Sequence, residues 1–230
     1  MNAPAVILFG ASRGTGLELA RVLRQRQVPV TAMLRGEAGR GELDALGVAL
    51  VAGDALNPAD LTQALAGMPA GYRIVSTLGG SARDGQLVDE IGNIALADAA
   101  LAEAAREHGP VRLVLITSLG CGEMAPHRSA AAIAAFGSVV DAKTRAEDHL
   151  RASGLPWTIL RPGGLRSEPA TGRGVLSADP EIHGFIHRAD LALLTERVLR
   201  DPATLHQALA AVDADQCHGP NPLTPFALAP

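Results

Sequence analysis

The chain has 230 residues, of which 47% are hydrophobic and 3% aromatic, and it carries a net charge of −4. This length and composition favour one domain with a buried core of its own. The acidic balance and the scarcity of aromatic rings count against nucleic-acid and anionic-membrane partners, which need clustered positive charge or stacking platforms.

Short apolar runs alternate with segments of helical periodicity along the first half of the chain. We expect strands at residues 5–9, 30–34, 48–52 and 73–78. We expect helices at residues 15–27, 41–46, 58–66 and 86–108. Pro58 suits the first position of its helix, because its missing N–H would have no helical partner there. Glycines follow the first and the fourth strand and end them.

The second half continues the alternation with longer irregular stretches. Strands are expected at 111–117, 157–160 and 207–212, and helices from about residue 140 to 153 and at 190–199. Two loops, 119–137 and 165–187, are expected to cover a substrate, and a proline-rich tail at 217–230 is expected to be irregular. The loops contain apolar residues such as Met124 and Phe185, which favour a mainly apolar pocket.

Strand–helix alternation of this kind predicts an α/β fold. We expect a Rossmann-type, doubly wound, mostly parallel sheet with helices on both faces and a small loop-rich substrate lobe, all in a single domain over 1–230. Ligands of such sheets bind at the carboxyl ends of the strands. The segments that directly follow predicted strands, and so converge on that edge, are 10–16, 35, 53–54, 78–80, 117–118 and 162–164.

A glycine-rich turn joins the first predicted strand to the first predicted helix. Gly10, Gly14 and Gly16 follow the pattern G-x-x-x-G-x-G. Glycines permit a tight turn, close approach of a pyrophosphate and close packing of helix on strand. The helix that begins near Thr15 offers free N–H groups and its positive dipole end to the phosphates. The residues expected to bind a dinucleotide here are Gly10, Ser12, Arg13, Gly14, Thr15 and Gly16.

Several motifs together resemble the short-chain dehydrogenase/reductase superfamily, and in particular its atypical NAD(P)-binding branch of flavin/biliverdin reductase-like and NmrA-like proteins. The motifs that carry the resemblance lie at residues 9–16, 51–54, 76–80, 117–120, 155–165 and 187–191. They cover nearly the whole chain, and their order is more specific than any one of them. The resemblance implies an oxidoreductase with a nicotinamide cofactor.

Basic residues beside the turn favour NADP(H) over NAD(H). Arg35 follows the second strand, where NAD-binding proteins often carry an acidic residue, and Arg13 lies within reach of the same place. Two guanidinium groups suit a 2′-phosphate. The resemblance implies that Asp54 accepts a hydrogen bond from the adenine amine, whereas the alternative is that Asp54 caps the helix ahead of Pro58. By the same resemblance the adenosine site includes Asp54, Ala55, Leu78, Gly79 and Gly80.

The reaction end lacks the tyrosine that the superfamily uses as its general acid. Ser118 ends the fifth strand and Lys143 lies on the next helix. Val139 stands four residues before Lys143, where the spacing Y-x-x-x-K requires the tyrosine. The only tyrosine, Tyr72, begins the fourth strand, in the wrong place. Ser118 and Lys143 remain the candidate catalytic residues.

Two interpretations stay open for each remaining polar group at the reaction end. Lys143 either donates to the nicotinamide ribose hydroxyls or pairs with Glu147 one helical turn away. Thr117, which is included in the cofactor site, and Ser118 either polarise a substrate oxygen or only end a strand. Candidates for an acid that replaces the tyrosine are Asp141, His127, His149 and His187.

The turn after the sixth strand completes the expected cofactor site. By the resemblance, Pro162, Gly163 and Gly164 present their backbone to the nicotinamide carboxamide. Two glycines after a proline also permit close approach of backbone to a flat ring. The seven histidines show no metal-ligand spacing, so we expect no metal.

These observations favour an NADP(H)-dependent oxidoreductase that acts on a small apolar, aromatic or conjugated acceptor. A flavin, a quinone or a conjugated tetrapyrrole would need little acid assistance, which fits the missing tyrosine. Two alternatives remain open: a non-catalytic NADP(H) sensor of the NmrA-like kind, and an isomerase, epimerase or dehydratase that uses bound nicotinamide transiently. We expect a small-molecule substrate, and both a monomer and a homodimer stay open.

The N-terminus and the cysteines indicate a cytoplasmic protein. The chain begins without the basic segment of a signal peptide, and no stretch is long and apolar enough to span a bilayer. Cys121 and Cys217 are too few for a disulfide framework in a chain of this size. We therefore expect two reduced thiols, a cytoplasmic location and no membrane partner.

Overall fold

The computed structural model describes residues 3–80, 85–105 and 112–229. Its centre is an eight-stranded sheet in the order β3-β2-β1-β4-β5-β6-β10-β8, and every neighbouring pair is parallel except β10 with β8. The chain moves outward from β1 to β3 and then returns to β4, so the strand order reverses between β1 and β4. The strands are β1 Val6–Phe9, β2 Val30–Leu34, β3 Ala49–Ala52, β4 Arg73–Ser76, β5 Arg112–Ile116, β6 Trp157–Pro162, β8 Gly174–Ser177 and β10 Ala208–Asp213.

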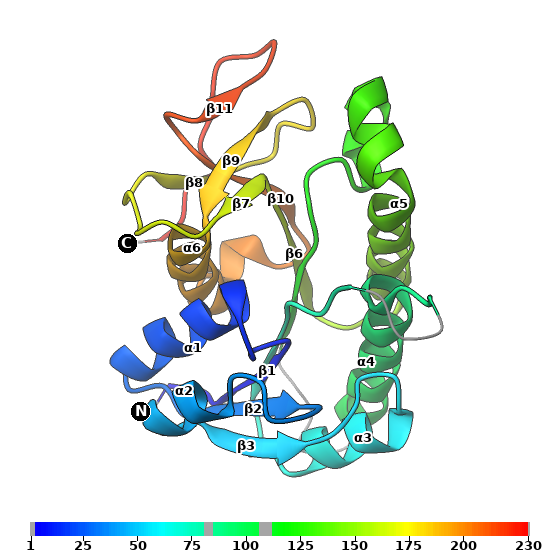
Figure 1. Ribbon diagram of the computed structural model, residues 1–230, viewed down its shortest axis with the longest axis vertical. Helices are drawn as coiled ribbons and strands as arrows, with labels where there is room; N and C mark the ends of the chain where they lie inside the picture. Colours follow the sequence, from blue (N-terminus) through cyan, green and yellow to red (C-terminus); the bar gives the residue numbers. More distant parts are fainter. Residues whose placement is uncertain (1–2, 81–84, 106–111, 230) are drawn as a thin grey trace.

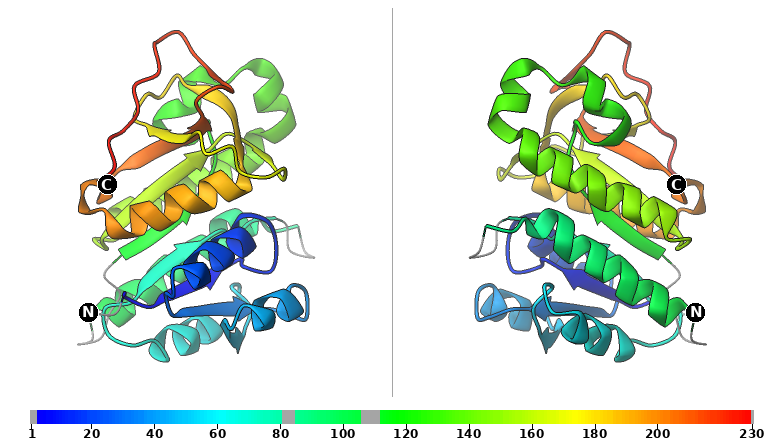
Figure 2. Two further views of the ribbon diagram at one scale, coloured as in Figure 1. Left: turned by 90° about the vertical axis from the view of Figure 1, so that its left-hand side faces the viewer. Right: turned by 90° about the vertical axis from the view of Figure 1, so that its right-hand side faces the viewer.

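Helices cover both faces of this sheet (Figure 1). Helices α1 and α6 pack against each other on one face, and α3, α4 and α5 pack in series on the other, as the two side views in Figure 2 show. The helices are α1 Gly14–Gln25, α2 Arg40–Ala45, α3 Pro58–Ala66, α4 Val88–Ala104, α5 Ala130–Ala152 and α6 Arg188–Arg200, with short 3-10 helices η1 Gly122–His127 and η2 Pro202–Thr204. The predicted doubly wound α/β fold is therefore confirmed.

Strand β1 shows why the sheet needs a layer on each side. Successive side chains of a strand point to opposite faces. Val6 and Leu8 accordingly join the core beneath α1 and α6, whereas Ile7 and Phe9 join the core beneath α3, α4 and α5. All four are buried. A continuous apolar run is what a central parallel strand with two covered faces requires.

The segment expected as the loop 165–187 instead contains strands. Strand β8 extends the main sheet through antiparallel pairing with β10. Strands β7 Gly164–Arg166, β9 His183–His187 and β11 Cys217–His218 form a second sheet in the order β11-β9-β7. The irregular tail expected at 217–230 therefore begins with a short strand. These strands are short, and β7, β8 and β9 contain glycine, so partners distant in the chain, and not local propensity, decide their conformation.

The loop expected at 119–137 is also too long, because α5 begins at Ala130 and not near Val140. The Ser129 side chain accepts a hydrogen bond from the Ala132 N–H and so caps the helix. An alanine-rich first turn with strong helical propensity follows it, and Gly137 lies buried inside the helix. Only the stretch up to residue 129, which includes η1, connects β5 to α5.

The remaining expected elements occur with small shifts at their ends. The long helix α4 ends at Ala104, and the predicted end at His108 falls outside the described residues. Helix α3 begins at Pro58, as expected. Over the part of the chain that the structure describes, none of the helices has the length and apolar character needed to cross a membrane.

Candidate functional site

The glycine turn between β1 and α1 lies at the strand-order reversal. Gly10 and Gly14 have φ angles of +86° and +57°, which disfavour residues with a Cβ. Gly16 has a different requirement, since a Cβ there would lie 2.5 Å from the Gly10 carbonyl oxygen. The first two glycines thus shape the turn, and the third allows α1 to pack closely against it. The turn and the close packing are two of the three functions expected from the spacing, and the close approach of a pyrophosphate stays a prediction.

A cleft of about 750 Å³ opens at the carboxyl ends of the strands, above this turn. Of the expected cofactor residues, those that line it are Gly10, Ser12, Arg13, Gly14, Thr15, Arg35, Asp54, Ala55, Leu78, Gly79, Gly80, Thr117 and Lys143. Gly16, Ser118 and the segment 162–164 do not line it. Most of the residues predicted from the sequence to bind the cofactor therefore line one cavity, which they reach from the ends of five different strands and from α5.

The start of α1 has the features that a phosphate needs. The first N–H groups of a helix have no partner inside the helix, and the helix dipole favours negative charge there. The Thr15 hydroxyl oxygen is buried and finds no hydrogen-bond partner among the described residues. Neighbouring Arg13 also lines the cleft. These unused donors fit the diphosphate of a nicotinamide nucleotide.

Arg35 and Asp54 lie together at the β2 and β3 end of the cleft. One Arg35 guanidinium nitrogen is 4.0 Å from an Asp54 carboxylate oxygen, and 69% of the Arg35 side chain is exposed. The alternative that Asp54 caps α3 is wrong, because the Asn57 side chain accepts from the Ala59 N–H. Asp54 instead accepts a hydrogen bond from the Leu56 N–H at 3.0 Å. Arg35 thus keeps most of its surface open to a ligand.

Lys143 is held by a residue that sequence reasoning missed. Its ammonium pairs with the carboxylate of Asp89, which is only 3% exposed, and not with Glu147. The other Asp89 carboxylate oxygen accepts a hydrogen bond of 2.7 Å from the Gly80 N–H. Asp89 therefore connects Lys143 on α5 with the loop after β4. The available signal was an acidic residue in the first turn of α4, where it also complements the helix dipole.

Thr117 belongs to a buried chain of polar groups behind the cleft. Its hydroxyl donates a 2.6 Å hydrogen bond to Glu147, which is fully buried. Glu147 in turn accepts from the Arg161 guanidinium at 2.5 Å and 3.1 Å. Because the hydroxyl has one proton, Thr117 presents only an acceptor to the cleft. Of the two interpretations of Thr117, polarisation of a substrate oxygen does not fit this arrangement, because the hydroxyl already donates to Glu147.

Ser118 points away from the cleft toward a buried thiol. Its hydroxyl oxygen lies 3.6 Å from the sulfur of Cys121, which is fully buried. Burial raises the pKa of the Cys121 thiol, and the charge of Glu147 raises it further. Cys121 therefore stays a thiol near neutral pH, and the structure gives Ser118 no contact with the cleft.

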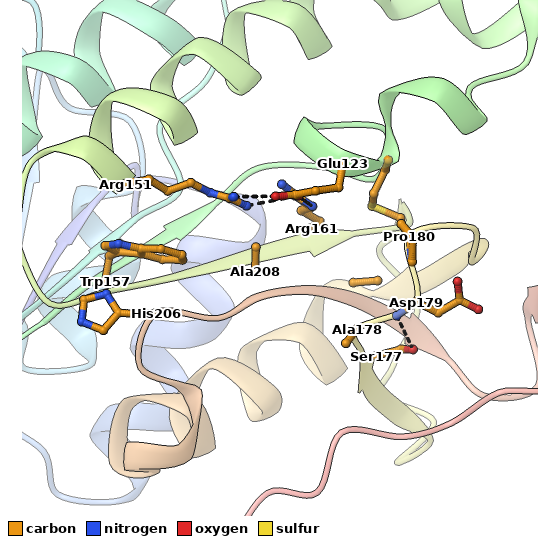
Figure 3. Close-up of a pocket in the computed structure, with 12 residues that line it drawn as sticks. Glu123, Arg151, Trp157, Arg161, Ser177, Ala178, Asp179, Pro180, His206 and Ala208 are labelled. Carbon is orange, nitrogen blue, oxygen red and sulfur yellow. Dashed lines mark hydrogen bonds and ion pairs between the residues drawn. The ribbon is translucent and has the colours of Figure 1, made fainter.

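The polar chain continues into a second, smaller hollow of about 320 Å³ (Figure 3). Arg161 and Arg151 both reach Glu123, at 2.8 Å and 2.5 Å. The hydrogen bond from Arg151, with help from Arg161, lowers the pKa of the Glu123 carboxyl to about 2. Trp157 and His206 form one end of the hollow, and Ala208 contributes to its floor. Glu123 thus pairs with both guanidinium groups that line this hollow.

Four residues were candidates to replace the missing tyrosine, and none of them lines the cleft. His149 pairs with Asp98 on the outer side of α5, and Asp141 pairs with Arg128. His127 lies 3.5 Å from Glu181. His187 is buried, with its Nδ1 atom 2.6 Å from the Pro169 carbonyl oxygen.

The two residues that bear on the tyrosine question lie as the sequence predicted. Val139 occupies the tyrosine position of α5 and is half-buried. Tyr72 is buried in the core beneath α3 and α4, where burial, and then the charge of Glu103, raises its pKa. Within residues 3–80, 85–105 and 112–229, no tyrosine lines the cleft.

The glycines at 163 and 164 have a packing function. A Cβ on Gly163 would lie 2.4 Å from the Gly184 carbonyl oxygen, and one on Gly164 would lie 2.5 Å from the Phe185 ring. The close approach expected toward a flat cofactor ring is therefore an approach to strand β9. Leu165, the next residue, lines the cleft instead.

Arg188 is a second residue that sequence reasoning missed. It is the first residue of α6 and lines the cleft beside the glycine turn. The motif at 187–191 contained it, but no chemical function followed from the sequence alone. Among the described residues, no cluster of three or more histidine, cysteine or acidic side chains could hold a metal ion.

Comparisons with known proteins agree with this geometry. A family model described as NAD(P)H-binding matches residues 10–202. The solved structure of ChuY, an anaerobillin reductase from Escherichia coli O157:H7, is 34% identical with a TM-score of 0.81, covering 92% of this chain and 98% of that one. A Bacillus subtilis protein named uncharacterized sugar epimerase YhfK is 32% identical over 91% of this chain and 94% of its own. Sanguinarine reductase from Eschscholzia californica is 27% identical over 81% of each chain.

The family match begins at the glycine turn and extends beyond α6, so it includes every residue that lines the cleft. The resemblance to the atypical NAD(P)-binding branch is thereby confirmed, and reductases stand among the relatives. The chain is a member of the NAD(P)H-binding family, with a Rossmann-type fold and a nicotinamide cofactor.

Proposed function

We propose that this protein is an NADPH-dependent reductase of an extended conjugated acceptor, of the linear tetrapyrrole kind. The observation that carries the proposal is a nucleotide cleft whose reaction end, within the described residues, has Lys143 and Thr117 but no tyrosine or histidine. The 34% identity to an anaerobillin reductase over nearly the full length of both chains supports the acceptor class. Arg13 and Arg35 support the phosphorylated cofactor.

Each cleft residue then has a specific task. The start of α1 and the Thr15 hydroxyl bind the diphosphate, and Arg13 and Arg35 bind the 2′-phosphate. Lys143, positioned by Asp89, donates to the hydroxyls of the nicotinamide ribose. Thr117 accepts a hydrogen bond from the carboxamide, because its own proton is held by Glu147.

The absence of tyrosine and histidine from the described lining of the cleft fits a conjugated acceptor. Bound NADPH supplies a hydride to an electron-poor carbon. A simple carbonyl would need a proton donor as charge develops on its oxygen, and general acid catalysis typically contributes about 10²–10⁴-fold. A conjugated system spreads the negative charge over many atoms and takes its proton from solvent later. Val139 at the tyrosine position therefore does not prevent such a reaction.

An epimerase is the second candidate, because the Bacillus subtilis relative carries that description. A sugar epimerase that oxidises and reduces a hydroxyl transiently needs a group that takes and returns the hydroxyl proton. Here the Thr117 hydroxyl donates its hydrogen bond to Glu147 and so is not free to take up and return the proton of a substrate hydroxyl, and no tyrosine lines the described part of the cleft. The geometry therefore favours the reductase.

The test is a turnover assay that follows NADPH absorbance with a linear tetrapyrrole, a flavin, a quinone and a nucleotide sugar. We expect stoichiometric NADPH oxidation with the tetrapyrrole, slower oxidation with NADH, and none with the sugar. Epimerisation of the sugar without net NADPH loss would favour the second candidate. No NADPH oxidation with any of the conjugated acceptors would overturn the proposal.

A further inference from the structure

We propose that Arg188 is a cofactor-binding residue that holds the diphosphate of the nucleotide and connects it to the small β11-β9-β7 sheet. The inference rests on the proposed binding of NADPH in the cleft. It assigns to the C-terminal part of the chain a direct contact with the cofactor. It also predicts that cofactor binding organises the place where the acceptor binds.

Arg188 lies directly over the glycine turn. Its Nε and Cδ atoms are 3.4 Å and 3.6 Å from the position that a Cβ on Gly14 would occupy. Helix α6 packs against α1 along the same face of the sheet (Figure 2), and the contact between Arg188 and Gly14, the first residues of the two helices, brings their starts together. The guanidinium therefore faces the place where the N–H groups of α1 and the Thr15 hydroxyl meet a diphosphate.

The charge of Arg188 is not neutralised by the described part of the chain. Its Nη1 atom donates to two uncharged oxygens, the Leu165 carbonyl at 3.3 Å and the Ser167 hydroxyl at 2.8 Å, and no carboxylate among the described residues forms an ion pair with it. By contrast, Lys143 pairs with Asp89. An arginine with unused donors that lines a nucleotide cleft is suited to a phosphate.

Among the described lining residues, the acidic side chains lie at the β2 end of the cleft and not beside Arg188. The cationic residues in its lining are Arg13, Arg35, Lys143 and Arg188, and the acidic ones are Glu37 and Asp54. Asp54 lies near Arg35, and Glu37 pairs with Arg40 outside the lining. Both acidic residues therefore lie beside arginines near the β2 end. The positive charge at the turn beneath Arg188 stays available for a diphosphate.

The two hydrogen bonds of Arg188 give the contact a further consequence. Leu165 belongs to β7 and lines the cleft, and Ser167 follows it. A diphosphate that fixes the guanidinium also fixes these two acceptors, because the planar fork holds its donors in a rigid arrangement. We therefore expect the acceptor to bind after NADPH, beside Leu165 and Ser167, once the bound cofactor has fixed these two residues through Arg188.

The experiment compares Arg188→Gln with Arg188→Lys and with the control Arg166→Gln. Arg166 is an exposed arginine on β7 that stacks on the Phe185 ring at 4.5 Å and does not line the cleft. Kd values for NADPH and for NADH are measured by fluorescence titration without any acceptor. Tm is recorded for each variant. Arg35→Ala, which should affect NADPH alone, is measured in parallel.

We expect Arg188→Gln to weaken NADPH and NADH equally, by about tenfold or more, since both carry the diphosphate and a charge-assisted bond is lost. Arg188→Lys should keep part of the affinity, and Arg166→Gln should match the wild type. Kd values within twofold of the wild type for both Arg188 variants would overturn the inference. In that case a selective loss in Arg35→Ala would leave the proposed function standing. Failure of the wild-type protein to bind either nucleotide would overturn the proposed function itself.

Discussion

The two ends of the cleft hold their charged groups in opposite ways. At the β2 end, Arg35 is largely exposed and lies 4.0 Å from its partner Asp54. At the reaction end, Lys143 pairs with buried Asp89, and the Thr117 hydroxyl donates a hydrogen bond to buried Glu147. The first end keeps charge available for a ligand, whereas the second end uses its charge to fix geometry.

This difference indicates which property each end controls. A free cation contributes mainly to affinity and to the choice between two nucleotides. A buried ion pair contributes little net stability but becomes costly when one partner is removed. Substitutions at the β2 end should therefore change cofactor preference at nearly constant stability. Substitutions at the reaction end should change stability or rate at nearly constant preference.

The largest effect is expected for Glu147→Ala. It leaves the Arg161 guanidinium, which is 3% exposed, without its buried carboxylate. Breaking a buried pair in this way costs about 3–5 kcal/mol of the free energy of unfolding. Urea denaturation measures the loss, and Glu18→Ala, which removes an exposed pair with Arg21, should change it by less than about 0.5 kcal/mol. Equal losses in the free energy of unfolding for the two substitutions would contradict the difference expected between buried and exposed ion pairs.

Lys143→Met should lower the rate of acceptor reduction by about 10–100-fold, the value of a hydrogen bond to a charged group. The ratio of NADPH affinity to NADH affinity should equal that of the wild type, because NADPH and NADH carry the same hydroxyls on the nicotinamide ribose. Arg145→Met is the matched control on the same helix, since Arg145 pairs with Glu90 on an exposed face. A change in the affinity ratio for Lys143→Met would contradict the assignment.

Arg35→Ala should weaken NADPH binding by about tenfold, through loss of a charge-assisted contact with the 2′-phosphate. NADH binding should change little, because NADH lacks that phosphate. Isothermal titration of both nucleotides provides the measurement, with Arg26→Ala at the far end of α1 as a control. Equal losses for NADPH and NADH would show that Arg35 does not read the 2′-phosphate.

The smallest effect concerns Glu123 and acid stability. Hydrogen bonds from Arg151 and Arg161 lower its pKa to about 2. A lowered pKa stabilises the fold above the ordinary carboxyl value, and this contribution disappears as the pH falls through 2. Because 56% of the Glu123 side chain is exposed, screening keeps the contribution below about 1 kcal/mol. The free energy of unfolding should fall slightly less between pH 7 and pH 3 for Glu123→Gln than for the wild type. A larger fall for Glu123→Gln would contradict the stabilising contribution of the Glu123 carboxylate.

The fold and the β2 end of the cleft could be predicted because local sequence determines them. The glycine spacing, the buried run of β1 and the position of Arg35 after β2 are features of neighbouring residues. Parallel strands then bring every strand end to one edge. Thus 13 of the expected residues line the cleft without any knowledge of long-range contacts.

The reaction end and the small sheet could not be predicted in the same way. Asp89 meets Lys143 across α4 and α5, and Thr117 meets Glu147 across 30 residues. Strand β9 pairs with β7 and β11 from both sides, although it is short and contains Gly184. Pairings between distant residues decide these features, so the sequence alone predicts a cofactor contact at Pro162, Gly163 and Gly164, whereas both glycines pack on β9.

Asp89 sets a limit on how this protein can be redesigned. The same carboxylate holds the Gly80 N–H of the loop after β4 and the ammonium of Lys143. Engineering that loop for a different nucleotide would therefore disturb the group that orients the reacting half, and selectivity would be gained together with a loss of turnover. Arg35 shares no partner with Asp89, which makes its position the independent one for exchanging the coenzyme.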